Sequence, residues 1–420
     1  MGVMKRTKRA ITYIVSAALM LSGCVTTPSG QIGDMSTIVG PQLASVFDPK
    51  RDAIIDETKH KLDVIIPIFD PGLPEKTEET ETATEGVWPE LRRAEANRFA
   101  YLLKQAMDET KAFGAVRVTP DQTATGDIYV LGKILESNGE DVEIQVQVVD
   151  ISGESWLTRN FDHEVPEKFH SDIRNEGIDP YAPVFEKTAN RIALELEDKK
   201  ELDLQRLSQL TELRFGANMN EEAFIDHLEL NDGQAKLVSY PSEDDPMLTR
   251  TRSIRVRDQL FIDGLQDHYR SFSSQMEASY RIWQEQSLAE ISAQREANQE
   301  ATKQAALGVL VIGLAILAAA AGARSNSYSG QSAGATGAVL GGVAGAALLS
   351  NSFQTSEEAK VHREALNELG ASIDVDLAPR VVEFEKETAS LTGDAKAQFA
   401  QWREFLKKMY AAQATPEKQL

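Results

Sequence analysis

The chain contains one cysteine, Cys24, and six histidines, and their spacing decides what chemistry these side chains could perform. No histidine pair stands in the H-E-x-x-H arrangement of a zinc protease, and one thiol alone cannot build a cysteine-based metal site. The sequence also lacks a G-x-x-x-x-G-K phosphate loop and a G-x-G-x-x-G turn that follows a strand, and its one G-x-S-x-G match, at 330–334, falls within the glycine-rich region 305–349 and follows no strand pattern. We therefore expect a protein that is not an enzyme and that binds no metal or cofactor.

Two charged clusters lie close together in the middle of the chain. The acidic turn 243–245 lacks the alternating ligands and the glycine of a calcium loop, so we interpret it as a solvated turn. The second cluster is basic and consists of Arg250, Arg252, Arg255 and Arg257. We expect these arginines to pair with nearby carboxylates. The alternative is a docking site for an acidic glycan or a lipid headgroup.

The first 24 residues indicate where the single cysteine acts. They begin with four basic residues, Lys5, Arg6, Lys8 and Arg9. The apolar run 10–20 is too short to cross a bilayer and is typical of a cleaved export signal. The sequence Leu-Ser-Gly-Cys at 21–24 resembles the lipobox of bacterial lipoproteins, which implies cleavage before Cys24 and acylation of its amine and thiol. An ordinary signal peptide is the alternative. Because Val25 follows, and not the aspartate associated with inner-membrane retention, we expect an outer-membrane lipoprotein that faces the periplasm.

The charge of the mature chain limits its partners. Removal of residues 1–23 leaves 40 Lys and Arg against 65 Asp and Glu, a formal charge of −25. Such a surface repels phosphate backbones, so we expect no nucleic acid partner. It also repels anionic lipid headgroups, and the membrane must therefore be reached through acyl chains or apolar segments.

Hydropathy and composition predict an α+β protein of six parts. A small N-terminal α/β domain with an antiparallel meander precedes a long-helix region that carries an apolar, glycine-zipper helical hairpin. The expected parts are a signal peptide (1–23), a lipid-anchored linker (24–44), the α/β domain (45–200), a helical region (201–304), the glycine-rich membrane hairpin (305–349), and a C-terminal helical region with short strands (350–420).

The α/β domain is predicted element by element. The apolar run 62–69 is typical of a buried strand, and apolar spacing of three and four residues predicts a helix from Trp88 to about 113. Further strands are expected at 115–118, 127–134, 142–148 and 156–161, and a helix at 181–199. Asn138-Gly139 lies between two of these strands and predicts a hairpin.

Four stretches of this domain carry a resemblance to known proteins: DVIIPIFD at 63–70, FGAVRVTP at 113–120, GDIYVLGKILES at 126–137 and VEIQVQVVDISGE at 142–154. They resemble a small domain found in the curli-secretion lipoprotein, the Tol-system translocation protein and lipoprotein activators of peptidoglycan synthases. The resemblance covers about 100 of the 420 residues and implies an oligomerisation or docking module. The curli-like case implies a ring, but this chain builds its candidate membrane element from helices, so a shared pore mechanism is not implied.

The pattern of residues 247–304 predicts one helical stretch of 58 residues. Gly264 is the one position whose helix propensity interrupts it. Its apolar stripe consists of Phe261, Leu265, Tyr269, Phe272, Met276, Tyr280 and Trp283. The mean spacing of about 3.67 residues favours a straight or slightly right-handed helix pair over a left-handed coil. The alternative is a helix packed on a neighbouring element of the same chain. After the hairpin, we expect helices at 357–369 and 394–410 and a short strand pair within 380–392.

The region 305–349 predicts a membrane hairpin. Residues 305–323 contain no charge, and 19 residues of helix reach about 28 Å, close to the hydrocarbon thickness of a bilayer. In the second arm, Gly337, Gly341 and Gly345 share one helix face, where close backbone approach favours packing between helices. The alternative is a hairpin buried in a soluble core. If the hairpin enters lipid, the sequence leaves open whether the outer or the inner membrane receives it.

These observations predict a non-enzymatic outer-membrane lipoprotein that self-assembles into a homo-oligomer and supports envelope biogenesis or export. The alternative is a monomeric periplasmic regulator that docks on an envelope enzyme such as a peptidoglycan synthase. The tether 24–44 is short and the helical half is large, which favours the first hypothesis. An envelope hydrolase has no catalytic motif in the required strand-to-helix setting in its favour.

Overall fold

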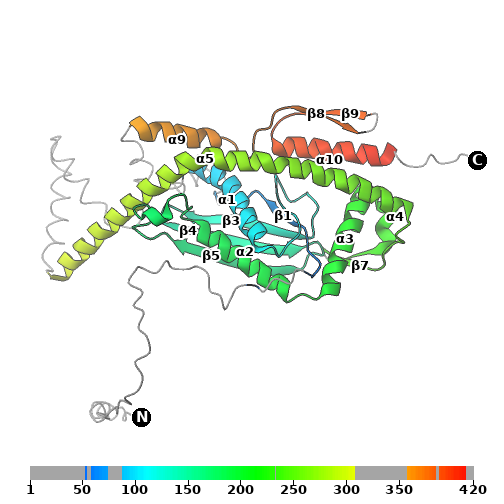
Figure 1. Ribbon diagram of the computed structural model, residues 1–420, viewed down its shortest axis with the longest axis horizontal. Coiled ribbons are helices and arrows are strands. Elements are labelled where there is room, and N and C mark those ends of the chain that lie inside the picture. Colours follow the sequence, from blue (N-terminus) through cyan, green and yellow to red (C-terminus); the bar gives the residue numbers. More distant parts are fainter. Residues whose placement is uncertain are drawn as a thin grey trace, which may run out of the picture. The chain divides into compact units, whose positions relative to one another are not determined.

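The computed structural model describes residues 53, 58–73, 88–231, 233–307, 357–384 and 387–412, and all of them belong to one unit, Val46–Leu420. Its first part contains β1 (Val64–Pro67), α1 (Pro89–Thr110), β2 (Val116–Thr119), β3 (Ile128–Ser137), β4 (Asp141–Asp150), β5 (Ser155–Glu164), η1 (Ile173–Asn175) and α2 (Ala182–Glu197). The rest contains α3 (Glu201–Met219), α4 (Glu221–Phe224), η2 (Ile225–His227), β6 (Leu228–Asn231), β7 (Gln234–Leu237), α5 (Pro246–Leu307), α9 (Glu357–Leu369), β8 (Arg380–Phe384), β9 (Glu387–Leu391) and α10 (Ala395–Ala412) (Figure 1).

The first five strands form one sheet in the order β2-β1-β3-β4-β5. The connection through α1 makes β1 and β2 parallel, and short turns make β3, β4 and β5 antiparallel. The β3–β4 turn closes as predicted, because Asn138 Oδ1 accepts the N–H groups of Glu140 and Asp141 at 2.9 and 2.6 Å. Gly139 adopts a φ of 97°, which favours glycine. The predicted α+β class is confirmed.

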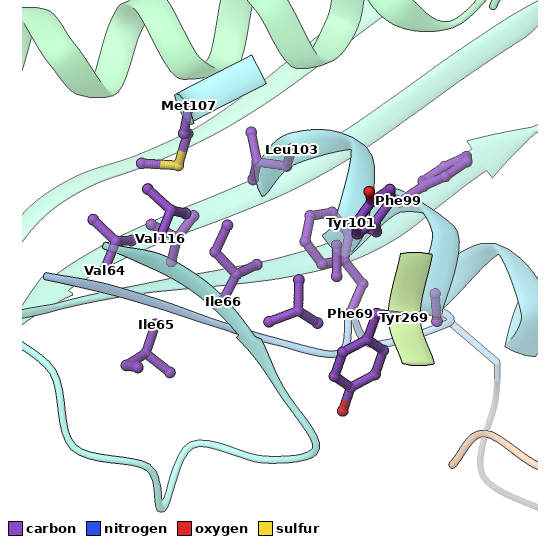
Figure 2. Packing of buried hydrophobic residues seen from close by; sticks show 14 of the residues in the cluster. Val64, Ile65, Ile66, Phe69, Phe99, Tyr101, Leu103, Met107, Val116 and Tyr269 are labelled. Atoms are coloured by element: carbon purple, nitrogen blue, oxygen red, sulfur yellow. The ribbon is translucent and has the colours of Figure 1, made fainter. Parts of the chain in front are cut away.

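One face of the sheet is covered by α1 and α2. Val64 and Ile66 lie on the same side of β1 as Leu103 and Met107 of α1, whereas Ile65 points to the opposite side (Figure 2). All of these side chains are buried. The alternation of a strand and the three- to four-residue spacing of a helix therefore produce the same apolar layer.

Helix α5 runs without interruption through the predicted stretch and spans 62 residues, about 93 Å at 1.5 Å per residue. Asp245 begins it, because its Oδ1 accepts the N–H groups of Met247 and Leu248 at 2.7 and 3.0 Å. Pro246 fits the first helical turn, where its missing N–H costs no hydrogen bond. Gly264 leaves the helix continuous.

The apolar stripe of α5 is buried along its whole predicted length, from Phe261 to Trp283. It packs on the sheet domain and on α10, where the Phe261 and Trp402 rings stack with centroids 4.9 Å apart. In the described part of the chain, the stripe therefore packs on other elements of the same chain, which was the alternative to a helix pair. One continuous core joins the sheet to α5 and α10, so residue 200 does not separate two hydrophobic cores.

The C-terminal elements return to the same body. In α9, His362 lies 3.1 Å from Ser279 of α5 through their Nδ1 and Oγ atoms, and Asn367 accepts from the Trp88 indole at 2.8 Å. The predicted strand pair appears as β8 and β9, and the predicted last helix as α10. Figure 1 shows α9 and α10 along α5.

A small hairpin and two short helices between α3 and α5 were not predicted. Strands β6 and β7 flank the sequence Asp232-Gly233, a two-residue hairpin signal, and Gly233 has a φ of 81°. The hairpin contacts the β4–β5 turn, where Ala235 donates its N–H to Ser152 O at 2.8 Å. Leu228 and Leu230 alternate with polar residues, as do Ala235 and Leu237, so the sequence carried a hairpin signal that was overlooked.

Several sequence predictions lie outside the described residues. They concern the lipidation site Cys24, the glycines Gly337, Gly341 and Gly345, and the hairpin 305–349 beyond residue 307. Residues 305–307 form the last turn of α5. Within the described part of the chain, no helix combines the length and the apolar character needed to span a membrane.

Candidate functional site

An extended interface joins α5 to the sheet domain, and it includes the edge strand β2. Gln266 of α5 accepts the Val118 N–H at 2.9 Å with Oε1 and donates to Val118 O at 2.8 Å with Nε2. The side-chain amide takes the place of a neighbouring strand. An exposed strand edge invites pairing with other chains, and here α5 covers it.

An ionic contact also joins the edge strand β2 to α5. Arg117 of β2 binds Asp263 of α5 through Nε and Nη2, at 2.6 and 3.3 Å, and its Nη1 lies 3.3 Å from Asp63. Asp63 also accepts the Ala115 N–H at 3.0 Å, which ties the start of β2 to the start of β1. The carboxylates outweigh burial and raise the pKa of Arg117. The guanidinium therefore stays charged and holds α5 to both parallel strands.

A fully buried carboxyl group lies further along the interface. Glu95 of α1 is 0% exposed, and its Oε1 accepts from Ser137 Oγ at 2.6 Å and from the Tyr280 hydroxyl at 2.8 Å. Arg92 Nε lies 3.7 Å from Oε2. Burial raises the pKa of Glu95, and Arg92 with the two hydroxyl donors offsets part of that effect. One side chain thus joins α1, β3 and α5.

The β3–β4 turn is pressed directly against α5. Tyr181, at the start of α2, accepts the Gly139 N–H at 2.7 Å through its hydroxyl. A Cβ atom on Gly139 would lie 2.5 Å from the Cβ of Ser287 in α5. Glycine is therefore required at this position both for its φ and for the close approach of the helix.

Arg98 forms a second buried link between α1 and α5. Its Nη1 donates to Ser273 O at 3.1 Å, and its Nη2 lies 2.7 Å from Asp179 and 2.5 Å from Glu277. Its guanidinium also lies over the Tyr280 ring, 5.0 Å from the centroid. The two carboxylates outweigh burial and raise the pKa of Arg98. This arginine connects the loop before α2 with α5.

The far end of the interface is an ion pair at the β3–β4 turn. Arg295 of α5 binds Glu140 at 2.7 Å and Glu164 at 3.2 Å. Burial raises the pKa of Glu140, and Arg295 offsets part of the rise. From Gln266 to Arg295, hydrogen bonds and ion pairs therefore fix about 44 Å of α5 to the sheet domain, at 1.5 Å per residue.

The structure distributes the predicted arginine cluster over different partners. Arg252 holds Glu212 and Glu243 at 2.7 and 2.6 Å, whereas Arg250 lies over the Tyr410 ring and donates to Tyr410 O. The positive charge of Arg255 acts on Asp127 and Asp258, and Arg257 is half-buried. Pairing with carboxylates is thus seen directly for Arg252. The structure does not bring the four side chains together as one exposed basic surface.

The described residues offer no site for a bound metal. They contain no group of three or more His, Cys, Asp or Glu side chains that could hold an ion. Three of the histidines contact serines, in the pairs His60–Ser208, His227–Ser239 and His362–Ser279. The perturbed carboxyl of Glu95 is enclosed by its own hydrogen-bond donors, so a substrate has no access to it.

Sequence reasoning missed this interface network, although one signal was present. Arg92, Glu95 and Arg98 stand three residues apart in the predicted helix, among its apolar residues, and all three are buried in α1. Charged residues at such positions are rarely fully buried unless they are paired, so they point to partners on another element. Nothing in the sequence identified Tyr280 and Ser273 as those partners, because both lie more than 170 positions away.

The fold and this interface define an α+β protein in which a long helix is fastened to a five-stranded sheet by buried polar contacts. In comparisons with known proteins, no family model, no curated protein and no solved structure matched the chain.

Proposed function

We propose that this chain is a lipid-anchored protein of the bacterial outer membrane that carries the apolar segment 305–349 on a rigid support and self-assembles through it. In this proposal, Cys24 attaches the chain to the inner leaflet. The α/β domain is the docking or oligomerisation module. The assembly serves envelope biogenesis or export and performs no chemistry of its own.

One observation carries this proposal: the apolar segment is inserted in the sequence between α5 and α9, and both helices are fastened to the same element, α1. Helix α5 is held through Glu95 and Arg98, as described above. The end of α9 is held where Arg93 donates to Gly370 O at 2.7 Å and Asn97 donates to Ile373 O at 2.7 Å. The helices that precede and follow this insert are therefore held to one element of the described body.

The close approach at the end of α9 supports the same interpretation. A Cβ on Gly370 would lie 1.8 Å from Glu90 O, so only glycine allows the chain to cross α1 at this point. A support of this kind is expected when the carried segment bears load or must be positioned. A monomeric regulator with a single docking domain does not need α9 to be fixed to the same element as α5.

The test separates the lipid from the apolar segment as sources of membrane attachment. Residues 25–420, the mature chain without Cys24, are exported with an ordinary cleavable signal, so that no acyl group is added. The membranes of these cells are washed with alkaline carbonate. We expect this chain to remain in the membrane pellet. A second version, in which residues 308–349 are replaced by a hydrophilic sequence of equal length, should be released. Release of both versions would contradict a membrane-embedded segment.

A further inference from the structure

Arg295 joins the distal part of α5 to a group of carboxylates on the sheet domain. Its Nη1 lies 2.7 Å from Glu140 and 3.2 Å from Glu164, and its Nη2 lies 3.7 Å from Asp141. The charge of Glu167 also acts on Glu140. One guanidinium therefore faces four carboxylates, and a surplus of negative charge remains when all of them are ionised.

Glu140 differs from the other carboxylates because it is shielded from water. It is 3% exposed, whereas the side chain of Glu164 is 65% exposed. Oε1 of Glu140 accepts a hydrogen bond from Arg295, but its Oε2 is buried and has no donor within the described part of the chain. A proton on Oε2 removes this unsatisfied charge and leaves the contact at Oε1 in place. Glu140 is therefore the group of the cluster at which a proton binds most favourably.

Helix α5 provides this shielding. A Cβ on Gly139, the neighbour of Glu140 in the β3–β4 turn, would lie 2.5 Å from Ser287 Cβ and 3.3 Å from Leu288 N, so the helix passes directly over the turn. Further along α5, Arg295 reaches Glu140. If this part of the helix lifts, water reaches Glu140 and screens the neighbouring carboxylates. The open state therefore holds the proton less tightly than the closed state does.

We propose that Arg295 and Glu140 form a pH-sensitive latch that closes the distal part of α5 onto the β3–β4 turn. Proton uptake by Glu140 favours the closed latch, and proton loss leaves the surplus negative charge that favours opening. The pKa of Glu140 in the closed state lies above the ordinary 4.5, so its contribution to closure is fully present below pH 4.5 and is lost as the pH rises through the raised pKa.

The latch acts on the helix that leads into the segment 305–349, and it sets how firmly the sheet domain holds that helix. This consequence rests on the proposed function, in which α5 supports the segment. The latch itself consists of described residues and does not depend on a membrane.

The test follows hydrogen exchange of the α5 amides 289–295 in the mature chain, in mild detergent, between pH 5 and pH 8. An unstructured peptide of the same sequence corrects for the intrinsic effect of pH on exchange. We expect protection to be about 3- to 10-fold higher at pH 5 than at pH 8. Glu140→Gln removes the titrating group and should make the protection independent of pH. Arg295→Met should lower the protection at pH 8, because the carboxylates then face no cation.

The matched control is Glu154→Gln. Glu154 pairs with Lys199 at 3.0 Å near the other end of β5, so this variant should keep the pH dependence of the parent. Equal pH dependence in the parent and in Glu140→Gln would overturn the latch, as would higher protection at pH 8 than at pH 5. Neither result bears on whether the segment 305–349 enters a membrane, which the carbonate wash tests separately.

Discussion

The Tyr280 hydroxyl donates a hydrogen bond to Glu95 Oε1 at 2.8 Å, across 185 positions of sequence, and both side chains are shielded from water. This contact brings the long helix α5 onto α1. A carboxyl group in such a position would be strongly unfavourable without donors, and α5 supplies one of them. The helix and the sheet domain therefore stabilise each other through a buried polar contact as well as through their apolar faces.

Removing the Tyr280 hydroxyl should lower the stability of the fold. We expect Tyr280→Phe to reduce the free energy of unfolding by about 1–3 kcal/mol, because Glu95 loses a donor it cannot replace from solvent. Urea unfolding of the mature chain measures the change. Tyr269→Phe is the matched control on the same helix, since the buried Tyr269 hydroxyl has no partner among the described residues and its loss should cost little. Equal losses in the two variants would contradict the role of the Glu95 contact.

The pH dependence of stability should report the buried carboxyl of Glu95. Burial raises its folded-state pKa above the ordinary value of 4.5. Its contribution to stability is therefore fully present below pH 4.5 and is lost as the pH rises through the raised folded-state pKa. Glu95→Gln removes this titration, so the variant should gain stability relative to the parent as the pH rises above 4.5. Urea unfolding between pH 4 and pH 8 measures the difference. A difference that is independent of pH would show that Glu95 titrates normally.

The amide of Gln266 should protect the edge of β2. Gln266→Ala removes both hydrogen bonds to Val118, and we expect faster hydrogen exchange at the Val118 amide together with a loss of about 1–3 kcal/mol. Gln275→Ala serves as the control, because Gln275 is exposed and contacts only Ser271 of its own helix. Unchanged exchange at Val118 in Gln266→Ala would mean that α5 protects the edge without this side chain.

Substitutions at two glycines with positive φ distinguish the cost of backbone strain from the cost of disturbed helix packing. Gly177 has a φ of 80°, and a Cβ atom added there would meet no described atom within 4 Å. Gly177→Ala should therefore cost about 1–2 kcal/mol from conformation alone. Gly139 has a φ of 97° and meets Ser287 of α5, so Gly139→Ala should cost clearly more. Thermal and urea unfolding of the two variants give the comparison. Equal costs would place α5 further from the turn than the structure has it.

The strands, turns and helices of this fold could be predicted from the sequence more fully than the way they pack against one another. The alternation from Val142 to Val148 and the turn at Asn138-Gly139 are local patterns, and they predicted the meander that the structure confirms. The stripe from Phe261 to Trp283 predicted a buried face on α5 but left its partner open. A periodic stripe reports which side of a helix avoids water and carries no information about the surface that covers it.

The candidate interface was harder to predict for the same reason. Glu95, Arg98 and Gln266 are polar residues whose role depends on a partner far away in the sequence. The cluster from Arg250 to Arg257 shows the opposite case, where neighbouring charges left one docking surface open as the alternative to pairing with carboxylates. On a helix, positions 250 and 252 point in different directions, and the structure gives Arg250 and Arg252 separate partners.

The central claim is that the segment between α5 and α9 drives assembly in a membrane. The most direct test is the mass of the acylated full chain, extracted in mild detergent, beside the variant in which residues 308–349 are replaced by a hydrophilic sequence of equal length. We predict a large, discrete oligomer for the parent chain and its collapse to a monomer in the variant. A monomer in both samples would contradict the account and would direct attention to the partner that the α/β domain binds.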